Sequence, residues 1–280
     1  MDTSRSELAP QPARAAVLIA FSGLISRALG LLRDRLFAHT FGAGEVLDAY
    51  FAAYRVPDLL YNLLIVGALS AAFVPVASQY FAAGSQGRAS AFRMTNALLT
   101  LAMLLLSLLA IVLFFLAPRI MPFFVPGFDS ERMALTVLFT RIMLLQPIFL
   151  GASSIVSGLL LTLRRFAAYA AAPVAYNLGI IIGLFAFVPW FGVSGLAWGV
   201  VLGAVGHLAV QLPSAVRAGF RFRPVLTAAH DGLRRVSRLF LPRLVALLAG
   251  QVGGVVVTVL GSGLLAGSIA AYLFAENLQA

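Results

Sequence analysis

Apolar stretches of about 20 residues recur along the whole chain, separated by short polar or glycine- and proline-rich segments. A helix needs about 20 apolar residues to cross the hydrocarbon core of a bilayer. The pattern therefore predicts an all-α, polytopic membrane protein with about eight transmembrane helices. The expected helices cover residues 15–40, 46–81, 91–117, 131–162, 167–188, 194–216, 236–260 and 264–280.

The longest gap between these segments runs from Arg217 to Arg238, and we place the domain division there. The last expected helix contains Glu276 and Asn277 and has no polar tail after it, so we expect a truncated second lobe. The predicted parts are a cytoplasmic tail (1–14), a complete N-terminal lobe of six helices (15–218), a basic amphipathic linker (219–235) and the first two helices of a second lobe (236–280).

The composition agrees with a membrane protein, because 61% of the residues are hydrophobic and only 11% are charged. The net charge of +10 would also suit a nucleic-acid-binding protein, but the basic residues concentrate in the N-terminal tail and in alternate loops. By the positive-inside rule, this distribution predicts a cytoplasmic N-terminus. We expect the basic loops to attract anionic lipids and do not expect a nucleic-acid partner.

The chain has no cysteine and no lysine. This excludes disulfides, thiolate metal sites, a thiol nucleophile and the lysine of a phosphate-binding loop. The histidines lack metal-ligand spacing, and no nucleophile, base and orienting group form a recognisable set. We therefore expect neither an enzyme nor a metal site or cofactor, apart from coupling to a monovalent cation or a proton.

Charged residues inside the first expected helix point to a cavity. A charge at the bilayer centre costs at least about 2.5–3.5 kcal/mol, so each needs a partner or a wet space. At 100° per residue, Arg27 and Asp34 lie within about 20° of each other, and Arg33 lies about 120° from Arg27 at the edge of the same polar stripe. The opposite side is leucine-rich. The first helix is thus expected to form one wall of a polar cavity.

The second expected helix repeats this arrangement, with Asp48, Arg55 and Asp58 on one side, although Pro57 bends it. One alternative is that the charges neutralise one another, for example Arg33 with Asp34, or Asp48 with Arg55. Because arginine is in excess across these two helices, the pattern favours an anion, and the guanidinium group suits phosphate or diphosphate.

The first two expected helices contain a series of motifs: Ser26-Arg27-Ala28-Leu29-Gly30-Leu31-Leu32-Arg33-Asp34, Phe41-Gly42-Ala43-Gly44, Asp48-Ala49-Tyr50-Phe51, Arg55-Val56-Pro57-Asp58-Leu59-Leu60 and Gly67-Ala68-Leu69-Ser70-Ala71-Ala72-Phe73-Val74-Pro75. In order and spacing, this series resembles the MurJ/MviN lipid II flippases. The resemblance covers nearly the whole chain, because it continues downstream in Pro126-Gly127-Phe128, Arg141-Ile142, Arg165-Phe166, Asn177 and Gln211-Leu212-Pro213.

The resemblance implies the multidrug/oligosaccharidyl-lipid/polysaccharide exporter fold, in which two helical lobes surround a central cavity. It also implies that undecaprenyl-diphosphate-linked peptidoglycan precursor, lipid II, is flipped from the inner to the outer leaflet of the bacterial cytoplasmic membrane by alternating access. On this basis we assign diphosphate binding to Arg27, Arg33 and Arg55, and gating or ion coupling to Asp34, Asp48 and Asp58.

Other positions depart from the family pattern or stay open. Tyr61, Val66 and Asn277 stand where the better-known members carry charged residues. Arg141 lies deep in the fourth expected helix and is expected to line a cavity or an interface between lobes. The remaining helices could come from a second chain.

Two other functions stay open. One is an exporter of small molecules or of another polyprenyl-linked oligosaccharide, which in its cation-coupled form would use Asp34 and Asp48 as ion sites. The other is an inactive truncated remnant.

Overall fold

The computed structural model describes residues 10–63, 73–226 and 231–279. No strand occurs in these ranges, and the prediction of an all-α fold is confirmed. The elements are α1 (Pro10–Phe41), α2 (Glu45–Tyr61), α3 (Val74–Ala82), α4 (Gly84–Phe124), α5 (Ser130–Met143), α6 (Gln146–Thr162), α7 (Phe166–Ala186), α8 (Val188–Phe191), the 3₁₀ turn η3 (Gly192–Ser194), α9 (Gly195–Ala209), α10 (Leu212–Arg217), α11 (Asp231–Ser262) and α12 (Ser268–Gln279).

Several helical segments are long and apolar enough to cross a membrane, which confirms the polytopic membrane fold. They are Ala13–Phe41, Gly84–Phe124, Ser130–Thr162, Phe166–Ala186 and Val188–Arg217, and they correspond to the first, third, fourth, fifth and sixth expected helices. The second expected helix includes residues outside the described ranges. The seventh and eighth correspond to α11 and α12, so the total of about eight spans stays a prediction.

Two expected helices are interrupted, and several begin earlier than expected. The segment 131–162 breaks between α5 and α6, and the segment 194–216 breaks between α9 and α10. In both cases a proline, Pro147 or Pro213, lies in the first turn of the second helix, where its missing N–H costs no helical hydrogen bond. The helix expected from residue 91 starts at Gly84. Only Gln146 and Gln211 interrupt the apolar residues at these breaks, so the mean hydropathy does not reveal them.

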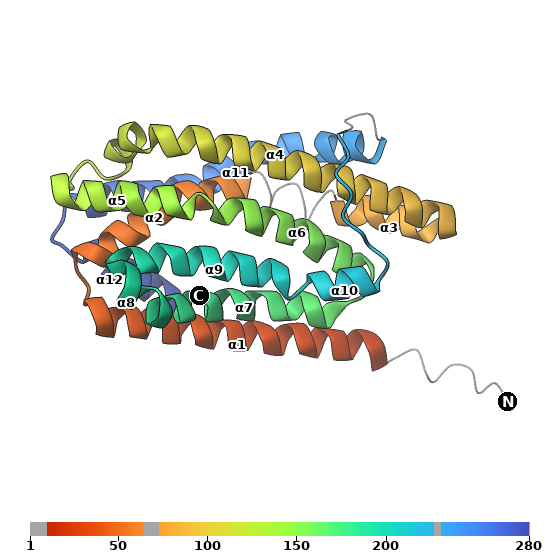
Figure 1. Cartoon of the computed structure of the whole chain (residues 1–280), viewed down its shortest axis with the longest axis horizontal. Coiled ribbons are helices and arrows are strands. Elements are labelled where there is room, and N and C mark those ends of the chain that lie inside the picture. Colours follow the sequence, from red (N-terminus) through yellow and green to blue (C-terminus); the bar gives the residue numbers. More distant parts are fainter. Residues whose placement is uncertain (1–9, 64–72, 227–230, 280) are drawn as a thin grey trace.

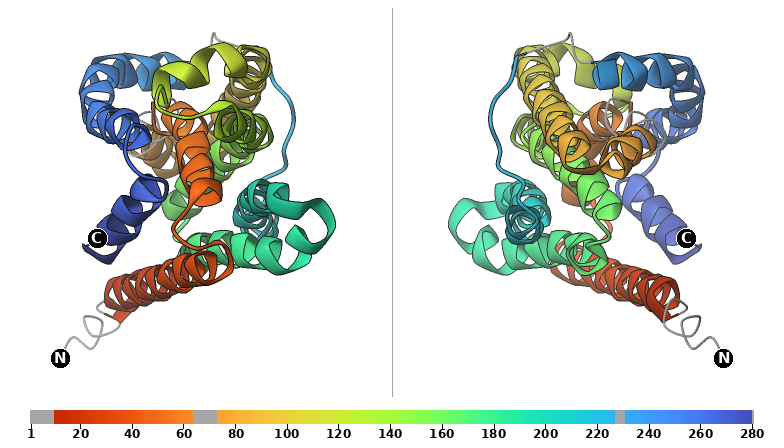
Figure 2. Two further views of the ribbon diagram at one scale, coloured as in Figure 1. Left: turned by 90° about the vertical axis from the view of Figure 1, so that its left-hand side faces the viewer. Right: turned by 90° about the vertical axis from the view of Figure 1, so that its right-hand side faces the viewer.

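The long helices run side by side, with the connecting turns at the two ends of the bundle (Figure 1). α1 packs along α7 and α7 along α9, while α2 packs against α5 and α6, and α4 against α6. α11 runs along α4, and α12 lies between α11 and α1 (Figure 2). The turns after α1, α4 and α11 share one end of the bundle, whereas the arginine-rich segment before α11 lies at the other (Figure 1).

The predicted linker begins as an extended segment. From Gly219 to Leu226 the chain crosses the end of the bundle without helical structure. The Asn96 side chain of α4 accepts a hydrogen bond from the Arg223 amide and donates one to the Arg221 carbonyl, at 3.1 and 3.2 Å. α11 then begins at Asp231, slightly before the expected residue 236.

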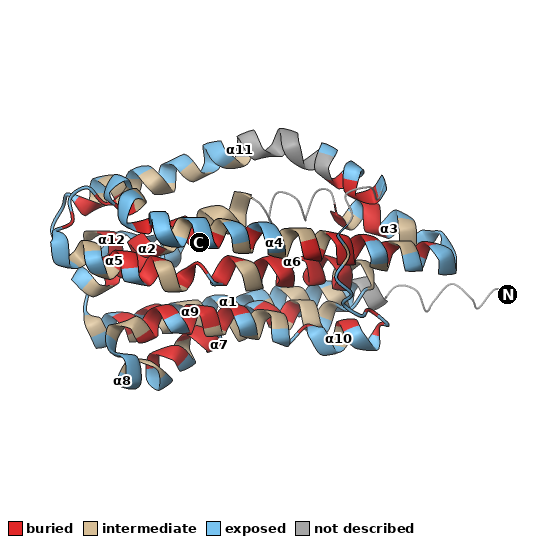
Figure 3. Cartoon of the chain, turned by 45° about the horizontal axis from the view of Figure 1, so that its top comes forward, coloured by how far each residue is buried: buried red, intermediate tan, exposed pale blue. Residues whose placement is uncertain are grey.

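Apolar side chains form both a buried core and an exposed outer surface. One buried cluster contains Phe37, Leu47 and Phe139, and a second contains Met94 and Leu159. Many apolar residues of α1 and α4 are exposed, as the helical faces in Figure 3 show. Lipid tails are as apolar as these side chains, so such a surface is expected in a membrane protein.

Glycines bring the backbones of α7 and α9 into direct contact. A Cβ atom added at Gly183 would lie 2.2 Å from the Cα of Gly199, and one added at Gly179 would lie 2.5 Å from the Cα of Gly203. Small residues commonly allow such close helix packing within membranes. This contact, referred to below as the glycine seam, fixes α7 against α9, and α1 packs on the other side of α7.

Candidate functional site

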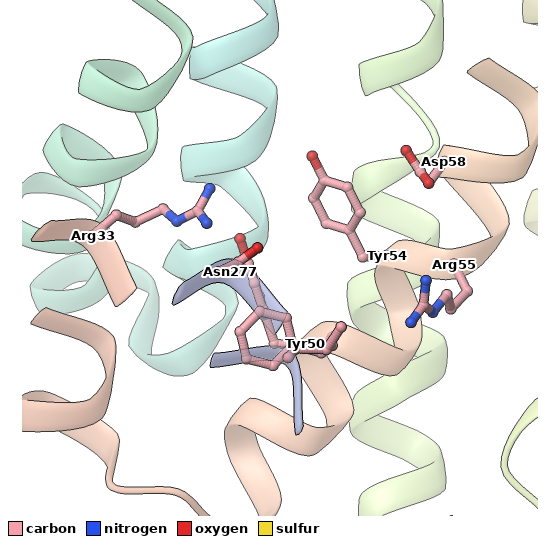
Figure 4. A pocket seen from close by; sticks show the side chains of 8 residues that line it. Arg33, Tyr50, Tyr54, Arg55, Asp58 and Asn277 are labelled. Atoms are coloured by element: carbon pink, nitrogen blue, oxygen red, sulfur yellow. The ribbon is translucent and has the colours of Figure 1, made fainter. Parts of the chain in front are cut away.

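A polar cavity lies where α1, α2 and α12 meet. Its volume is about 620 Å³, including the space open at its mouth. Side chains from the three helices point toward it from different sides (Figure 4). The lining residues are Arg33, Tyr50, Phe51, Tyr54, Arg55, Asp58, Leu273 and Asn277. The structure therefore brings together three of the charged residues that the sequence placed in a cavity.

Helical spacing explains the α2 wall. Tyr50, Tyr54 and Asp58 follow one another at intervals of four residues, so they lie on one face of the helix. Arg55 is next to Tyr54 in the sequence and lines the neighbouring part of the wall. The Tyr54 hydroxyl is held in place because it accepts a hydrogen bond from the Gln146 amide at 3.0 Å and also contacts the hydroxyl of Tyr176.

Arg33 is held by a carboxylate and an amide. Its Nε and Nη2 atoms donate to Oδ1 of Asp34 at 2.9 and 2.8 Å, and Nη1 donates to Oδ1 of Asn177 at 3.4 Å. The other carboxylate oxygen of Asp34 accepts a 2.8 Å hydrogen bond from Asn277 on α12. A guanidinium group has five N–H bonds. Arg33 is thus positioned by protein groups but keeps donors for a ligand.

The second cavity arginine has a neutral partner. Nε of Arg55 donates to the hydroxyl of Thr258 on α11 at 2.9 Å. The side chain passes close to Gly254, where an added Cβ atom would lie 2.8 Å from Nη1. Within the described residues Arg55 has no salt bridge at 4.0 Å or less. Its positive charge is therefore less fully compensated than that of Arg33.

Asp58 faces the cavity from α2, and its hydrogen-bond partner lies one helical turn away. Nδ2 of Asn62 donates to Oδ2 of Asp58 at 2.8 Å. The carboxylate has no direct ion pair with Arg55 in the described structure, although both residues line the same cavity. The cavity thus contains an acidic group as well as two arginines.

Asp48 does not line this cavity, in contrast to the sequence-based expectation. It is only 1% exposed, and its carboxylate caps the first turn of α12. Oδ2 accepts from the Gly267 amide at 2.6 Å, and Oδ1 accepts from the Ala270 amide at 2.8 Å. A carboxylate at a helix N-terminus satisfies free N–H groups and interacts favourably with the helix dipole. The alternative pairing of Asp48 with Arg55 does not occur, whereas that of Arg33 with Asp34 does.

The two remaining sequence-predicted arginines also lie outside the cavity lining. Arg27 is exposed on α1. Arg141 contacts the Phe114 carbonyl on α4 and lines a separate, mostly apolar groove between α4 and the α5–α6 break. Asn277, which departs from the family pattern, lies in the cavity, whereas Tyr61 pairs with Ser154 at 2.7 Å. Val66 and most of the motif from Gly67 to Pro75 lie outside the described residues.

Sequence reasoning did not select Tyr50, Tyr54 or Leu273, although all three line the cavity. The spacing of the two tyrosines before Asp58 was a usable signal, because it places them on the face of that acid. Leu273 gave no such signal. It reaches the cavity only because α12 folds back onto α2, more than two hundred residues away in the sequence.

A family model for the lipid II flippase MurJ matches residues 37–280 of the chain. The chain belongs to the MurJ family. The resemblance inferred from the sequence motifs is therefore confirmed. MurJ proteins are named as flippases, which are transporters, and this agrees with the expectation that the chain is not an enzyme.

Curated MurJ relatives match nearly the whole chain. The lipid II flippase MurJ of Burkholderia cenocepacia is 30% identical over 274 residues, covering 95% of this chain and 53% of that protein. A probable lipid II flippase MurJ of Vibrio cholerae is 29% identical, covering 95% of this chain and 52% of the relative. The chain thus spans about half the length of the curated MurJ relatives that it matches.

Solved structures agree with the family fold. A lipid II flippase MurJ in an inward closed conformation superposes with a TM-score of 0.77 at 26% identity, covering 94% of this chain and 54% of that structure. A MOP superfamily transporter from Pyrococcus furiosus is 18% identical and superposes with a TM-score of 0.65. The match covers 96% of this chain and 60% of the transporter structure. The second likeness supports the fold alone.

Proposed function

We propose that the chain forms the N-terminal half of a lipid II flippase in the bacterial inner membrane, with its N-terminus in the cytoplasm. In this proposal it moves the undecaprenyl-diphosphate-linked peptidoglycan precursor to the outer leaflet for cell-wall synthesis. The observation that carries the proposal is the cavity containing Arg33 and Arg55, in a membrane-embedded bundle of the MurJ family. An arginine without a salt bridge in such a place favours an anionic ligand.

The diphosphate is assigned to the cavity arginines. Arg33 keeps N–H donors after pairing with Asp34, and Arg55 carries a charge without a salt bridge in the described residues. Guanidinium groups bind phosphate oxygens through short, directional hydrogen bonds. Arg27 is exposed on the same helix as Arg33, and we assign it to the approach of the substrate rather than to the cavity itself.

The acidic residues take different roles in this proposal. Asp34 positions Arg33, and Asp48 holds α12, since each carboxylate accepts hydrogen bonds from protein donors on both of its oxygens. This use of Asp34 and Asp48 weighs against the cation-coupled exporter, which would need them as ion sites. Asp58 is the acid that faces the cavity, so we assign ion coupling or gating to it.

Alternating access requires that one end of the cavity closes while the other opens. At the end opposite the arginine-rich loops, α11 and α12 approach the rest of the bundle closely. A Cβ atom added at Gly267 would lie 2.2 Å from the Ala43 carbonyl, and one at Gly127 would lie 2.3 Å from that of Ser262. Together with the cap by Asp48, these contacts support an outer gate that must separate when the substrate is released.

Flipping is proposed for the whole transporter. Its division follows the sequence prediction, with the first lobe ending at residue 218 and the second beginning at 236. The MurJ relatives contain a further half with no counterpart here, and we propose that its equivalent, on the same polypeptide or on a second chain, completes the transport path.

Lipid binding by the purified chain tests the proposal directly. Native mass spectrometry in mild detergent would measure retention of added lipid II by the wild type, Arg33→Ala and Arg55→Ala. Loss of one charge-assisted hydrogen bond of about 1.5 kcal/mol predicts roughly tenfold weaker binding for either variant. Arg35→Ala is the matched control, because Arg35 is exposed on α1 and does not line the cavity.

The proposal is supported if both cavity variants lose lipid II while Arg35→Ala retains it. It fails if the well-folded wild type does not bind lipid II, or if all four proteins bind it equally. Binding of an undecaprenyl-diphosphate lipid that lacks the sugar and peptide would show whether recognition depends on the diphosphate.

A further inference from the structure

The groove beside Arg141 is separate from the polar cavity and opens on the outer surface of the bundle. It lies between α4 and the break between α5 and α6, and its volume is about 830 Å³, including the open space at its mouth. Its walls are mostly apolar, with Ile111 and Phe115 from α4 and Leu145 and Ile148 from the facing side. Ile111 and Phe115 are 57% and 67% exposed, so this groove faces the lipid.

Arg141 is the charged residue of this groove, and a proline explains how it is anchored. Pro118 has no N–H, so it cannot donate to the carbonyl of Phe114 four residues earlier in α4. Nε of Arg141 donates to that carbonyl at 3.1 Å, and the guanidinium carbon lies 4.9 Å from the centre of the Phe114 ring. The two Nη groups have no hydrogen-bond partner among the described residues, so the anchored arginine presents free donors.

The depth of these donors in the membrane follows from the sequence of α4. Its apolar run extends from Leu98 to Ala117 and is followed by Arg119. At a rise of about 1.5 Å per residue, Phe114 lies roughly 7–8 Å from Arg119 along the helix. The guanidinium group at Phe114 therefore lies roughly 7–8 Å inside the level of Arg119, toward the end of α4 that lies opposite the arginine-rich loops.

We propose that this groove binds an anionic glycerophospholipid, with its phosphate on the Nη groups of Arg141 and one acyl chain along the apolar wall. Charge complementarity identifies this occupant, because an unpaired arginine at this depth is costly and guanidinium binds phosphate through paired hydrogen bonds. A phospholipid also supplies both required parts in the correct order, since its phosphate is at the core boundary and its chains extend inward. A carboxylate on a neighbouring helix would satisfy the charge but would leave the apolar groove unfilled.

The test compares an anionic with a zwitterionic phospholipid. Native mass spectrometry of the purified chain would compare phosphatidylglycerol with phosphatidylcholine carrying the same acyl chains. We expect preferential retention of phosphatidylglycerol and roughly tenfold weaker retention by Arg141→Gln. Glutamine can still donate to the Phe114 carbonyl, so a purely structural role of Arg141 would be preserved. Arg141→Lys should retain most of the preference, because it keeps the charge.

Two further variants separate the groove from general surface attraction. Arg119→Gln removes an exposed arginine of α4 that lies outside the groove, and phosphatidylglycerol retention should be unchanged. Ser107→Phe fills the groove from α4 while leaving Arg141 intact, and retention should fall. The proposal is overturned if both lipids are retained equally, if Arg119→Gln has the effect of Arg141→Gln, or if retention is independent of Arg141.

This site is also distinguishable from lipid II binding in the cavity. Arg33→Ala should leave phosphatidylglycerol retention unchanged, and Arg141→Gln should leave lipid II retention unchanged. If Arg33→Ala instead abolishes phosphatidylglycerol binding, the phospholipid occupies the polar cavity and the groove proposal is wrong, whatever the outcome for lipid II.

Discussion

Replacement of Asp48 by alanine should release the first turn of α12 from the bundle. The carboxylate accepts hydrogen bonds from the amides of Gly267 and Ala270, at 2.6 and 2.8 Å, in a position that is 1% exposed. Each hydrogen bond to a charged group contributes about 1.5–3 kcal/mol, so the pair contributes at most about 3–6 kcal/mol. Water that enters after the substitution recovers part of this, and we expect a net loss of about 2–4 kcal/mol.

Hydrogen–deuterium exchange at α12 measures this loss. A loss of about 2–4 kcal/mol raises the opening equilibrium of the turn by about 30- to 1000-fold, at 1.36 kcal/mol per factor of ten. The Ala271 amide is a suitable reporter, because it bonds to the Gly267 carbonyl at 2.8 Å rather than to Asp48 itself. Asp48→Asn should give an intermediate increase, since the side-chain amide keeps one acceptor oxygen.

Glu45→Ala provides the control, because Glu45 is an exposed acid at the start of the same helix and lies 3.9 Å from Arg132 in its ion pair. Its exchange at Ala271 should match the wild type. Exchange at Ala271 that stays within threefold of the wild type in Asp48→Ala would refute the reasoning. The cap would then contribute little to holding α12, and the proposed outer gate would need another contact.

Two further predictions concern the glycine seam and the turn before α5. Gly183→Val should lower the free energy of unfolding by about 1–3 kcal/mol or more, since the added Cβ atom would lie 2.2 Å from the Gly199 Cα. Thermal unfolding in detergent measures this loss. Gly250→Val is the control and should be less affected, because the space around Gly250 is open. Hydrogen bonds from the backbone and guanidinium of Arg132 hold the pKa of Asp129 below its usual value of 3.8. Asp129 therefore stabilises α5 fully above pH 3.8, and this stabilisation is lost as the pH falls through the lowered pKa. Amide exchange at the start of α5 should become faster over this pH range, and Asp129→Asn should abolish the pH dependence of that exchange.

The sequence predicted the cavity better than it predicted the partners of each charge. Helical spacing placed Arg33, Arg55 and Asp58 on polar faces, and all three line the cavity. The same reasoning put Asp48 there, because a helical face defines a direction but not the element that covers it. The covering element is α12, whose N-terminus takes the carboxylate of Asp48 as a cap.

Long helices were also predicted better than their breaks. Apolar composition identifies a segment that can cross the membrane, but it does not give the position at which the helix breaks inside that segment. The breaks before Pro147 and Pro213 depend on which backbone groups find partners nearby, and this is decided by tertiary packing. Arg141 shows the same effect, since its contact with Phe114 results from a proline on another helix.

The glycine seam connects the helices that carry the two cavity arginines through a continuous set of packed helices. At the glycine seam the backbones of α7 and α9 touch without side chains between them, which restricts sliding of one helix along the other. α1, which carries Arg33, packs on α7. Through α6, which packs against both α9 and α2, the same framework extends to Arg55. Movement of α12 would then leave the helices that carry the two arginines in place, although it would remove the Asn277 hydrogen bond that helps to hold Asp34 beside Arg33. In this structure, the packing of α7 against α9 therefore helps to set the spacing of the helix segments that carry the cavity arginines, and with it the size of the anionic group that fits between them.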